Sequence, residues 1–442
     1  MQTERVLPAQ PYATFDDYLA AGGGEGYRTA LELAPDDVIE IVSASGLRGR
    51  GGAGFPTGTK WRSIVDAATD SPSYLVCNAA EGEPATFKDR TLLARNPFGV
   101  IEGMLIAMHA VGVERAYVGI KQRFDELQRM LDARDAFVEA GWPRAADIRI
   151  VGGPDEYLFG EESAMLEVIE GKLPLPRILP PYQTGLFATM RQLNPTVVNN
   201  VETLSHVTQI LREGADWFRQ LGTTEAPGTM VFTVLGDVAR SGVYELPLGT
   251  SISTLVVDLA GARDIQAIYA GTSNSVITPD LLDLPMDFDS FAEAGTGLGS
   301  GGLAVYDTSR DMVQVCAVLA RFLAIESCGQ CLACKLGTAD MFERLDRLVN
   351  GTGTVTDIAE IRKRTETVTD LNRCYLPVGA ALVIRSTLDQ FDDAFHAHVG
   401  RPTDPAVAVA VPKITAWDAA KGTFVLDPHY RRKRSDWSYA EA

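Results

Sequence analysis

The sequence predicts an α/β protein with a helical C-terminal unit. Between residues 36 and 213, short apolar strands alternate with helices, which is typical of a sheet layered with helices. Residues 226–308 change to β-branched strands and tight glycine turns, which indicate a small α+β unit. From residue 311 to about 399 the pattern is helical, and its short loops indicate a small bundle.

The composition narrows the class of protein. A chain of 442 residues is too long for one ordinary core, so we expect about two or three domains. The net charge of −18 argues against a nucleic-acid binder, which normally carries a basic face. No run approaches the roughly 18 apolar residues of a membrane-spanning helix, and the first residues lack a secretory signal pattern. We therefore expect a cytoplasmic protein without direct membrane insertion.

The N-terminal half predicts its elements in a clear order. Residues 1–35 are expected to be irregular because they are rich in glycine and proline. The expected helices that follow cover 36–46, 96–112, 124–138 and 200–213, and the expected strands cover 73–78, 115–120 and 147–153. Together these elements predict one α/β domain over residues 36–225.

The C-terminal half predicts two further domains and a tail. Residues 226–308 contain a helix-like segment at 252–262 and a second glycine-rich turn, GTGLGSGG, at 295–302. The helical bundle is assigned to 309–400, and the tail to 401–442. The tail carries the basic run Arg431, Arg432, Lys433 and Arg434, which we expect to be solvated, with docking of a partner as the alternative.

Four of the six cysteines form a ligand pattern. Cys328, Cys331 and Cys334 are each separated by two residues, so their thiolates can turn toward one centre, and Cys374 is the only candidate further along the chain. Three close ligands plus one distant ligand is typical of a [4Fe–4S] cluster. A tetrahedral zinc site has the same spacing and stays open at this point. Cys77 and Cys316 stand in apolar runs and are expected to be core residues.

A loop rich in glycine and positive charge predicts an anion site. Residues 46–61 read GLRGRGGAGFPTGTKW, which matches neither of the common phosphate-loop patterns. Glycines allow backbone N–H groups to approach a phosphate closely, and basic side chains add charge. The alternative is a flexible surface turn. The residues concerned are Gly49, Gly51, Gly52, Gly54, Arg50 and Lys60.

Three further polar stretches are candidate ligand contacts. The first, CNAAEGEPATFKDR at 77–90, follows an expected strand, and open α/β sheets bind ligands at the carboxyl ends of their strands. The second, EYLFGEES at 156–163, and the third, VVNNVETL at 197–204, each precede a helix. Taken singly, each has an ordinary structural explanation: a solvated loop, a carboxylate that complements a helix dipole, or an N-cap.

These stretches, followed by ESCGQCLAC at 326–334, occur in an order that resembles one family. The chain is similar to the flavoprotein subunit of respiratory complex I and to diaphorase subunits of NAD-linked hydrogenases and formate dehydrogenases. The resemblance covers roughly residues 36–400. It implies a Rossmann-like FMN domain, a small ubiquitin-like domain, and a C-terminal four-helix bundle carrying an iron–sulfur cluster. It implies an NADH dehydrogenase that moves a hydride between NAD(H) and FMN and then single electrons to a [4Fe–4S] cluster.

The resemblance also implies roles for individual residues. Phe55 matches an aromatic residue that stacks on the nucleotide. Tyr182, which stands where the family has phenylalanine, is a further candidate cofactor contact. Glu83 and Glu162 match acidic residues near the ribose and nicotinamide of NADH, and Glu162 is the candidate for tuning the nicotinamide site. The cluster ligands would be Cys328, Cys331, Cys334 and Cys374. The FMN contacts would be Gly49, Arg50, Gly51, Gly52, Lys60, Asn78, Glu81, Tyr157, Gly160, Glu161, Val198, Asn199 and Asn200.

Several positions depart from the family pattern, mostly on the dinucleotide side. They are Ser63, Ala80, Ala85, Phe159, Leu179 and Tyr182. Several lost contacts of about 1 kcal/mol each would weaken NADH binding about tenfold or more. The alternative reading is a flavin–[4Fe–4S] electron conduit that has lost NAD(H) binding and exchanges electrons with a partner protein or another carrier. A structural relative without redox activity is a third reading, against which the four intact cysteines argue.

A chain with one cluster implies partner subunits. The family pairs with a thioredoxin-fold [2Fe–2S] subunit and with a further iron–sulfur or catalytic subunit of a multisubunit oxidoreductase. Neither is present in this sequence. The sequence leaves open which complex the chain serves, and in which direction electrons flow.

Overall fold

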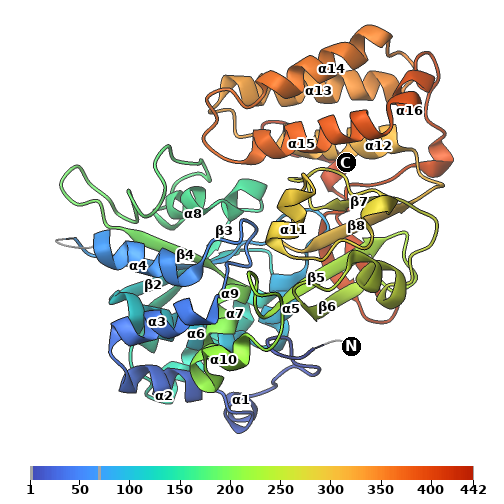
Figure 1. The fold of residues 1–442 in the computed structure, drawn as a ribbon. Helices are drawn as coiled ribbons and strands as arrows, with labels where there is room; N and C mark the ends of the chain where they lie inside the picture. Colours follow the sequence, from blue (N-terminus) through green and yellow to red (C-terminus); the bar gives the residue numbers. More distant parts are fainter. Residues whose placement is uncertain (1–2, 68–70, 442) are drawn as a thin grey trace.

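The structure is a computed structural model that describes residues 3–67 and 71–441. Its N-terminal part forms a parallel sheet covered by helices (Figure 1). The strands are β1 (Tyr74–Ala79), β2 (Arg115–Lys121), β3 (Ile148–Gly153) and β4 (Thr196–Asn200). The helices are α1 (Phe15–Ala20), α2 (Glu25–Glu32), α3 (Pro35–Ser45), α4 (Thr57–Ala67), α5 (Lys88–Arg95), α6 (Pro97–Val111), α7 (Glu126–Glu139), α8 (Glu162–Ile169), α9 (Val201–Glu213) and α10 (Ala215–Phe218).

The strand order β3-β2-β1-β4 creates a ligand-binding position. The chain runs from β1 outward to β2 and β3, and then returns to place β4 on the other side of β1. Such a reversal leaves a crevice at the carboxyl ends of β1 and β4, the strands on either side of the reversal. The register places Asn78 of β1 directly beside Asn200 of β4. Two of the polar stretches noted in the sequence therefore meet at this crevice.

Two local predictions for this part are wrong, and one strand is not predicted by the sequence. Residues 1–35 contain helices α1 and α2, and the buried Tyr18 and Tyr27 pack these helices against the core. The sequence does not predict the short buried strand β4, whereas the expected cap of α9 is confirmed, because the Asn200 side chain accepts from the backbone N–H of Glu202. The glycine loop also ends earlier than expected: α4 begins at Thr57, so Lys60 is helical. In each case the local sequence pattern is weak, and burial against residues distant in sequence determines the secondary structure of the segment.

The middle of the chain forms a mixed four-stranded sheet with the order β6-β5-β8-β7. Strand β5 pairs antiparallel with β6 and parallel with β8, and β7 pairs antiparallel with β8. The segment expected to be helix-like contains a short π-helix. The elements are β5 (Thr229–Gly236), β6 (Gly242–Pro247), the π-helix Thr254–Leu259, β7 (Ile265–Ala270), α11 (Phe288–Glu293) and β8 (Gly302–Asp307).

Helices dominate the remainder, and they lie together at the top of Figure 1. They are α12 (Met312–Glu326), α13 (Leu332–Val349), α14 (Val355–Thr367), α15 (Leu376–Gln390) and α16 (Asp392–Ala397). The tail then forms an antiparallel hairpin of β9 (Ile414–Asp418) and β10 (Thr423–Leu426). The expectation of a solvated basic tail is wrong for Lys433, which is 2% exposed, and the neighbouring Tyr430 is 1% exposed.

Candidate active site

A polar cavity of about 200 Å³ lies at the carboxyl ends of β1 and β4; we call it the inner cavity. Asn78 donates from Nδ2 to the carbonyl oxygen of Gly160 at 2.7 Å, which joins β1 to the turn before α8. The walls come from segments that are far apart in sequence. Its lining includes Gly51, Asn78, Glu81, Glu83, Tyr157, Gly160, Glu161, Asn200, Cys374 and Leu376.

A buried lysine, Lys88, holds two residues of the inner cavity's lining, Asp89 and Asn200, in place. Lys88 is 0% exposed, and its Nζ lies 2.7 Å from Asp89 and 2.9 Å from Glu202. The same ammonium donates to Oδ1 of Asn200 at 3.1 Å, and Nδ2 of Asn200 donates to Asp89 at 2.6 Å. This network fixes the amide of Asn200 at the cavity wall. Lys88 lies within the stretch 77–90, but no local pattern distinguishes it there as a site residue.

Glu81 has a local structural task beside this network. Its carboxylate accepts from the backbone N–H groups of Asp89 and Arg90, at 3.0 and 3.3 Å, and so satisfies the start of α5. Burial, together with the neighbouring Asp89 carboxylate, raises the pKa of Glu81 to about 7. Glu81 therefore shapes the cavity, and it holds its proton to a higher pH than an exposed glutamate does.

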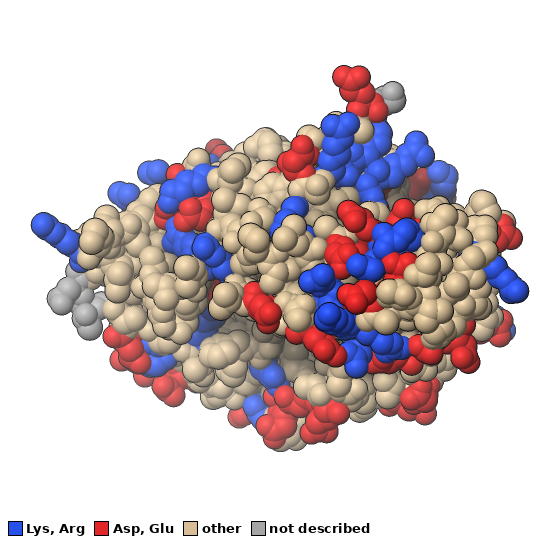
Figure 2. Space-filling view, turned by 90° about the horizontal axis from the view of Figure 1, so that it is seen from above, with Lys and Arg blue, Asp and Glu red and all other residues tan. Residues whose placement is uncertain are grey.

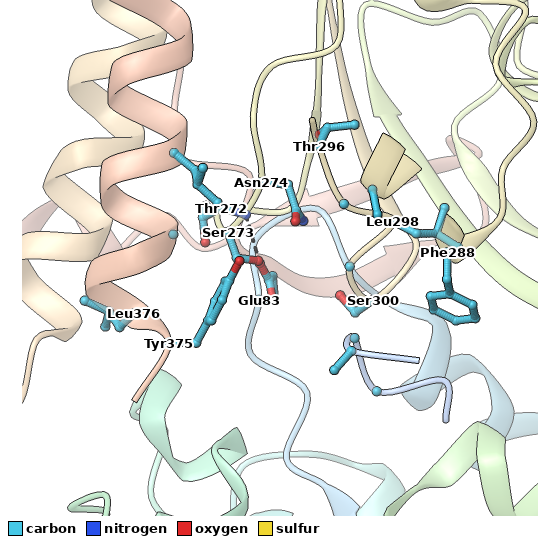
Figure 3. A pocket seen from close by; sticks show the side chains of 18 of the residues that line it. Glu83, Thr272, Ser273, Asn274, Phe288, Thr296, Leu298, Ser300, Tyr375 and Leu376 are labelled. Carbon is cyan, nitrogen blue, oxygen red and sulfur yellow. Dashed lines mark hydrogen bonds between the residues drawn. The ribbon is translucent and has the colours of Figure 1, made fainter. Parts of the chain in front are cut away.

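A larger cavity of about 570 Å³ adjoins the first, and we call it the outer cavity. Figure 3 shows side chains from three parts of the chain around it: Glu83 after β1, Thr272–Asn274 after β7, and Tyr375 and Leu376 at the start of α15. The two cavities are joined through shared walls. The shared residues are Gly51, Glu83, Tyr157, Ser300, Tyr375 and Leu376.

Glu83 stands at the junction of the two cavities. Its Oε1 accepts from the backbone N–H of Thr272 and from the hydroxyl of Ser273, both at 2.8 Å. Its Oε2 accepts from the Tyr157 hydroxyl at 3.4 Å. Burial raises the pKa of the Glu83 carboxyl. One side chain thereby ties the parallel-sheet unit to the mixed-sheet unit at the place where the cavities meet.

The glycine loop gives its backbone to these cavities. Gly51 and Gly52 line the outer cavity, and Gly52 has a φ of 141°, which L side chains rarely adopt. A Cβ at Gly52 would meet nothing within 4 Å, so open space lies over its backbone. At Gly54, by contrast, a Cβ would lie 2.5 Å from the Phe288 ring, so packing against α11 requires glycine there. The backbone of the loop is therefore open to the cavity at Gly52 and tightly packed against α11 at Gly54.

The guanidinium of Arg50 does not line either cavity. Arg50 is 0% exposed, and its three side-chain donors reach backbone carbonyls. The acceptors are Thr229 at 3.0 Å, Arg48 at 2.7 Å and Pro227 at 3.1 Å. The side chain attaches the glycine loop to β5. The geometry therefore does not support the expectation that the Arg50 guanidinium contributes positive charge to an anion site.

Replacing Arg50 with methionine is expected to destabilise the fold by about 3 kcal/mol, because three buried carbonyls lose a charged donor. The urea midpoint should fall clearly, whereas Arg62→Met, which removes an exposed ion pair with Asp36, should leave it nearly unchanged. A variant with unchanged stability but weakened FMN binding would instead support the phosphate role.

Other expected contacts lie outside the two cavity linings. Lys60 forms a partly exposed ion pair with Glu162 at 2.9 Å. The Asn199 amide oxygen accepts from the indole of Trp61 at 2.9 Å, which holds α4 against β4. Val198 is buried in an apolar cluster, whereas the rings of Phe55 and Tyr182 are 54% and 47% exposed.

The four cysteines meet around one small cavity under the helical unit, which we call the cysteine cavity. Cys328, Cys331 and Cys334 come from the segment that begins α13, and Cys374 comes from the turn before α15. None of the four forms a disulfide. Burial raises the pKa of the Cys334 and Cys374 thiols, and a bound metal favours the thiolate forms of its ligands.

Cys374 lines both the inner cavity and the cysteine cavity. Leu158 and Leu376 line both cavities as well, so the two sites share one wall. Among the described residues, no group of three or more His, Cys, Asp or Glu side chains closes around a single metal ion; the four cysteines instead surround the cysteine cavity. Cys77 and Cys316 are both 0% exposed, which confirms them as core residues.

Sequence reasoning missed the far wall of the outer cavity. Thr272, Ser273, Tyr375 and Leu376 carry no motif and reach the site only through the packing of three units. One signal was available: the second glycine-rich turn at 295–302 supplies Gly295–Ser300 to the lining. In the sequence this stretch indicates only a turn before a strand.

A cavity at the switch point of a parallel sheet, sharing Leu158, Cys374 and Leu376 with a site of four thiols, defines an electron-transfer protein that binds a nucleotide cofactor and an iron–sulfur cluster. Comparisons with known families agree. The Nuo51 FMN-binding domain matches residues 42–209, and the NADH-ubiquinone oxidoreductase-F iron-sulfur binding region matches residues 314–398. The chain belongs to the family of the F subunits of NADH-quinone oxidoreductase. The iron–sulfur match also decides against zinc for the four cysteines.

Similar proteins come from two kinds of complex. An F subunit of the NADH-quinone oxidoreductase of Rhizobium meliloti is 40% identical over 86% of this chain and 93% of its own length. The HndC subunit of the NADP-reducing hydrogenase of Solidesulfovibrio fructosivorans is 35% identical over 89% and 82%. A crystal structure of NAD+-reducing [NiFe]-hydrogenase superposes with a TM-score of 0.78 at 34% identity, covering 89% of this chain and 68% of that chain. The described helices include none with the length and apolar character needed to cross a membrane.

Proposed function

We propose that this chain is the electron-entry subunit of a multisubunit oxidoreductase, taking electrons from NADH through FMN to a [4Fe–4S] cluster. The observation that carries the proposal is Cys374, which lines both the inner cavity and the cysteine cavity. Bound FMN supplies two-electron chemistry toward NADH and one-electron chemistry toward the cluster. The residues of this chain bind and orient the cofactors and exclude water between them.

FMN fits the inner cavity by the chemistry of its walls. The backbone of the glycine loop suits a phosphate, and the amides of Asn78 and Asn200 and the carboxylate of Glu161 suit a heterocycle and a ribityl chain. Glu161 accepts from the backbone N–H of Ala164 at 2.8 Å, which fixes it at the start of α8. The full proposed set is Gly49, Gly51, Gly52, Asn78, Glu81, Tyr157, Gly160, Glu161 and Asn200 with the backbone of Arg50, supported from behind by Lys60, Val198 and Asn199.

NADH is assigned to the outer cavity, which opens onto the inner one at Glu83. The Glu83 carboxylate accepts from Ser273 and Thr272. A ribose hydroxyl of NADH would donate to the same carboxylate in competition with these two groups. Phe55 and Tyr182 offer exposed rings for the adenine. Glu162, paired with Lys60, would tune the nicotinamide end. NADH agrees with the NADH- and NAD+-linked names of the relatives.

The second candidate function is that of a flavin–[4Fe–4S] electron conduit that no longer binds NAD(H). Leu179, which replaces a family lysine, is 49% exposed and offers no charge to a pyrophosphate. Ser63 in turn donates to the Lys60 carbonyl at 2.8 Å and cannot stack on an adenine. In this reading electrons would arrive from a partner protein or another carrier.

Anaerobic titration with NADH separates the two functions. The purified protein is expected to lose its yellow absorbance with about one equivalent of NADH, because hydride transfer reduces one flavin per chain. NADPH is expected to act more weakly, since no basic cluster accompanies Glu81 and Glu83 to hold its extra phosphate. Bleaching by dithionite but not by NADH would favour the conduit instead.

The domain boundaries follow the same proposal. The FMN domain is assigned to residues 36–225, a ubiquitin-like domain to 226–308, the four-helix cluster domain to 309–400 and the tail to 401–442. The strand order β6-β5-β8-β7, with a parallel central pair, supports the ubiquitin-like assignment. The partners would be a thioredoxin-fold [2Fe–2S] subunit and a further iron–sulfur or catalytic subunit, in the cytoplasm. Co-purification from the native host tests both partners.

A further inference from the structure

The C-terminal tail returns to the cysteine cavity. Trp437 donates from its indole to the Ile325 carbonyl at 2.9 Å, and Lys335 bridges the carbonyls of Ser327 and Ser435 at 2.7 and 2.8 Å. The tail thus forms hydrogen bonds with residues on both sides of the segment that carries the three closely spaced cysteines. It lies beyond both matched family regions, the second of which ends at residue 398.

The basic run of this tail divides between the surface and the interior. On the face seen in Figure 2, Lys and Arg side chains are interspersed with Asp and Glu side chains. Arg431 and Arg434 are exposed, whereas Lys433 is 2% exposed. The Lys433 ammonium is therefore buried, and a buried charge needs a partner of opposite charge.

Within this tail, Lys433 forms a fully buried ion pair. Its Nζ lies 2.8 Å from Oε1 of Glu326, and the two side chains are 1% and 0% exposed. The Tyr430 hydroxyl donates to the same oxygen at 2.8 Å. The other oxygen, Oε2, accepts from the backbone N–H of Tyr157 at 3.0 Å. Glu326 is therefore held by the tail on one side, while its other side holds Tyr157 of the inner cavity.

The pair lies next to residues of both redox sites. Glu326 ends α12 and precedes the first cluster cysteine, Cys328, by two residues. Tyr157, which it holds, lines both cavities and bonds to Glu83. A charge in a dry protein interior acts strongly on neighbouring charges because little water screens it.

We propose that Lys433 is a positioning residue for electron transfer between the inner cavity and the cysteine cavity. It compensates the Glu326 carboxylate, so that this carboxylate fixes Tyr157 without adding an unbalanced negative charge beside the cluster. The proposal rests on the iron–sulfur assignment of the four cysteines. The reduction potential of an iron–sulfur cluster depends on nearby charge and hydrogen bonds, and an unbalanced negative charge disfavours the reduced state.

The test is the midpoint potential of the cluster in Lys433→Met, measured by EPR-monitored redox titration of the full chain. The potential is expected to shift to lower values, and Lys433→Arg should restore it. The double variant Lys433→Met/Glu326→Gln removes both charges, so its potential should return toward that of the parent. Lys421→Met is the matched control, because Lys421 lies on the same tail with a side chain that is 75% exposed.

A second variant keeps the test decisive if Lys433→Met does not accumulate. Tyr430→Phe removes one donor from the same carboxylate without stranding a charge, and a smaller shift in the same direction is expected. An unchanged potential in folded Lys433→Met would overturn the proposal, and where Lys433→Met does not fold, an unchanged potential in Tyr430→Phe would do so. Iron and sulfide analysis of the parent protein reports separately on the cluster itself, so failure of the proposed function is distinguishable.

Discussion

Replacing Cys374 with alanine is expected to remove the [4Fe–4S] signal from the protein while FMN stays bound. Cys374 is the proposed ligand in the turn before α15, and it lines the same cavity as Cys328, Cys331 and Cys334. Iron is expected to fall well below about four atoms per chain. Flavin reduction by NADH should persist, because the inner cavity keeps its other walls. EPR of the reduced protein and iron analysis measure the result.

The matched control for this variant is Cys316→Ala. Cys316 is buried in the same apolar cluster as the cysteine cavity and is 0% exposed, but it does not line that cavity. Its substitution should cost roughly 1 kcal/mol of packing energy and leave the cluster in place. Loss of the cluster in Cys316→Ala, or its full retention in Cys374→Ala, would contradict the ligand assignment.

Replacing Glu83 with alanine is expected to lower kcat/KM for NADH by about 100-fold. The carboxylate accepts from Thr272, Ser273 and Tyr157, and its loss leaves donors from two units without a partner at the junction of the cavities. Two such bonds at about 1.5 kcal/mol each account for an effect of that size. Steady-state reduction of ferricyanide by NADH measures the rate, and the flavin absorbance reports FMN content.

Two variants separate the geometry of Glu83 from its charge. In Glu83→Gln the amide oxygen still accepts from Thr272 and Ser273, so the loss should stay within about tenfold. Glu293→Ala removes an exposed carboxylate from α11 beside the outer cavity and should leave the rate unchanged. If Glu83→Gln is as impaired as Glu83→Ala, the charge is what matters, and the bridging explanation fails.

Much of the fold follows from local patterns. The strands β1, β2 and β3 are short apolar runs between helices, and α12–α15 show helical periodicity over their full length, so local pattern and burial agree there. Strand β4 is hidden in the sequence because its Thr196–Asn200 segment also has the pattern of a helix cap. The wall formed by Tyr375 and Leu376 carries no motif, because it arises only where α15 meets the two other units.

The sequence by itself determined the kind of chemistry: the cysteine spacing and the order of five polar motifs specify donors that only certain cofactors use. The tertiary structure decided what individual side chains do. It turned the guanidinium of Arg50 toward backbone carbonyls, made Cys374 common to two cavities, and buried Lys433 against Glu326. The physical reason is that cofactor type depends on which atoms a motif offers, whereas the burial of a charge depends on contacts between residues as far apart in sequence as Glu326 and Lys433.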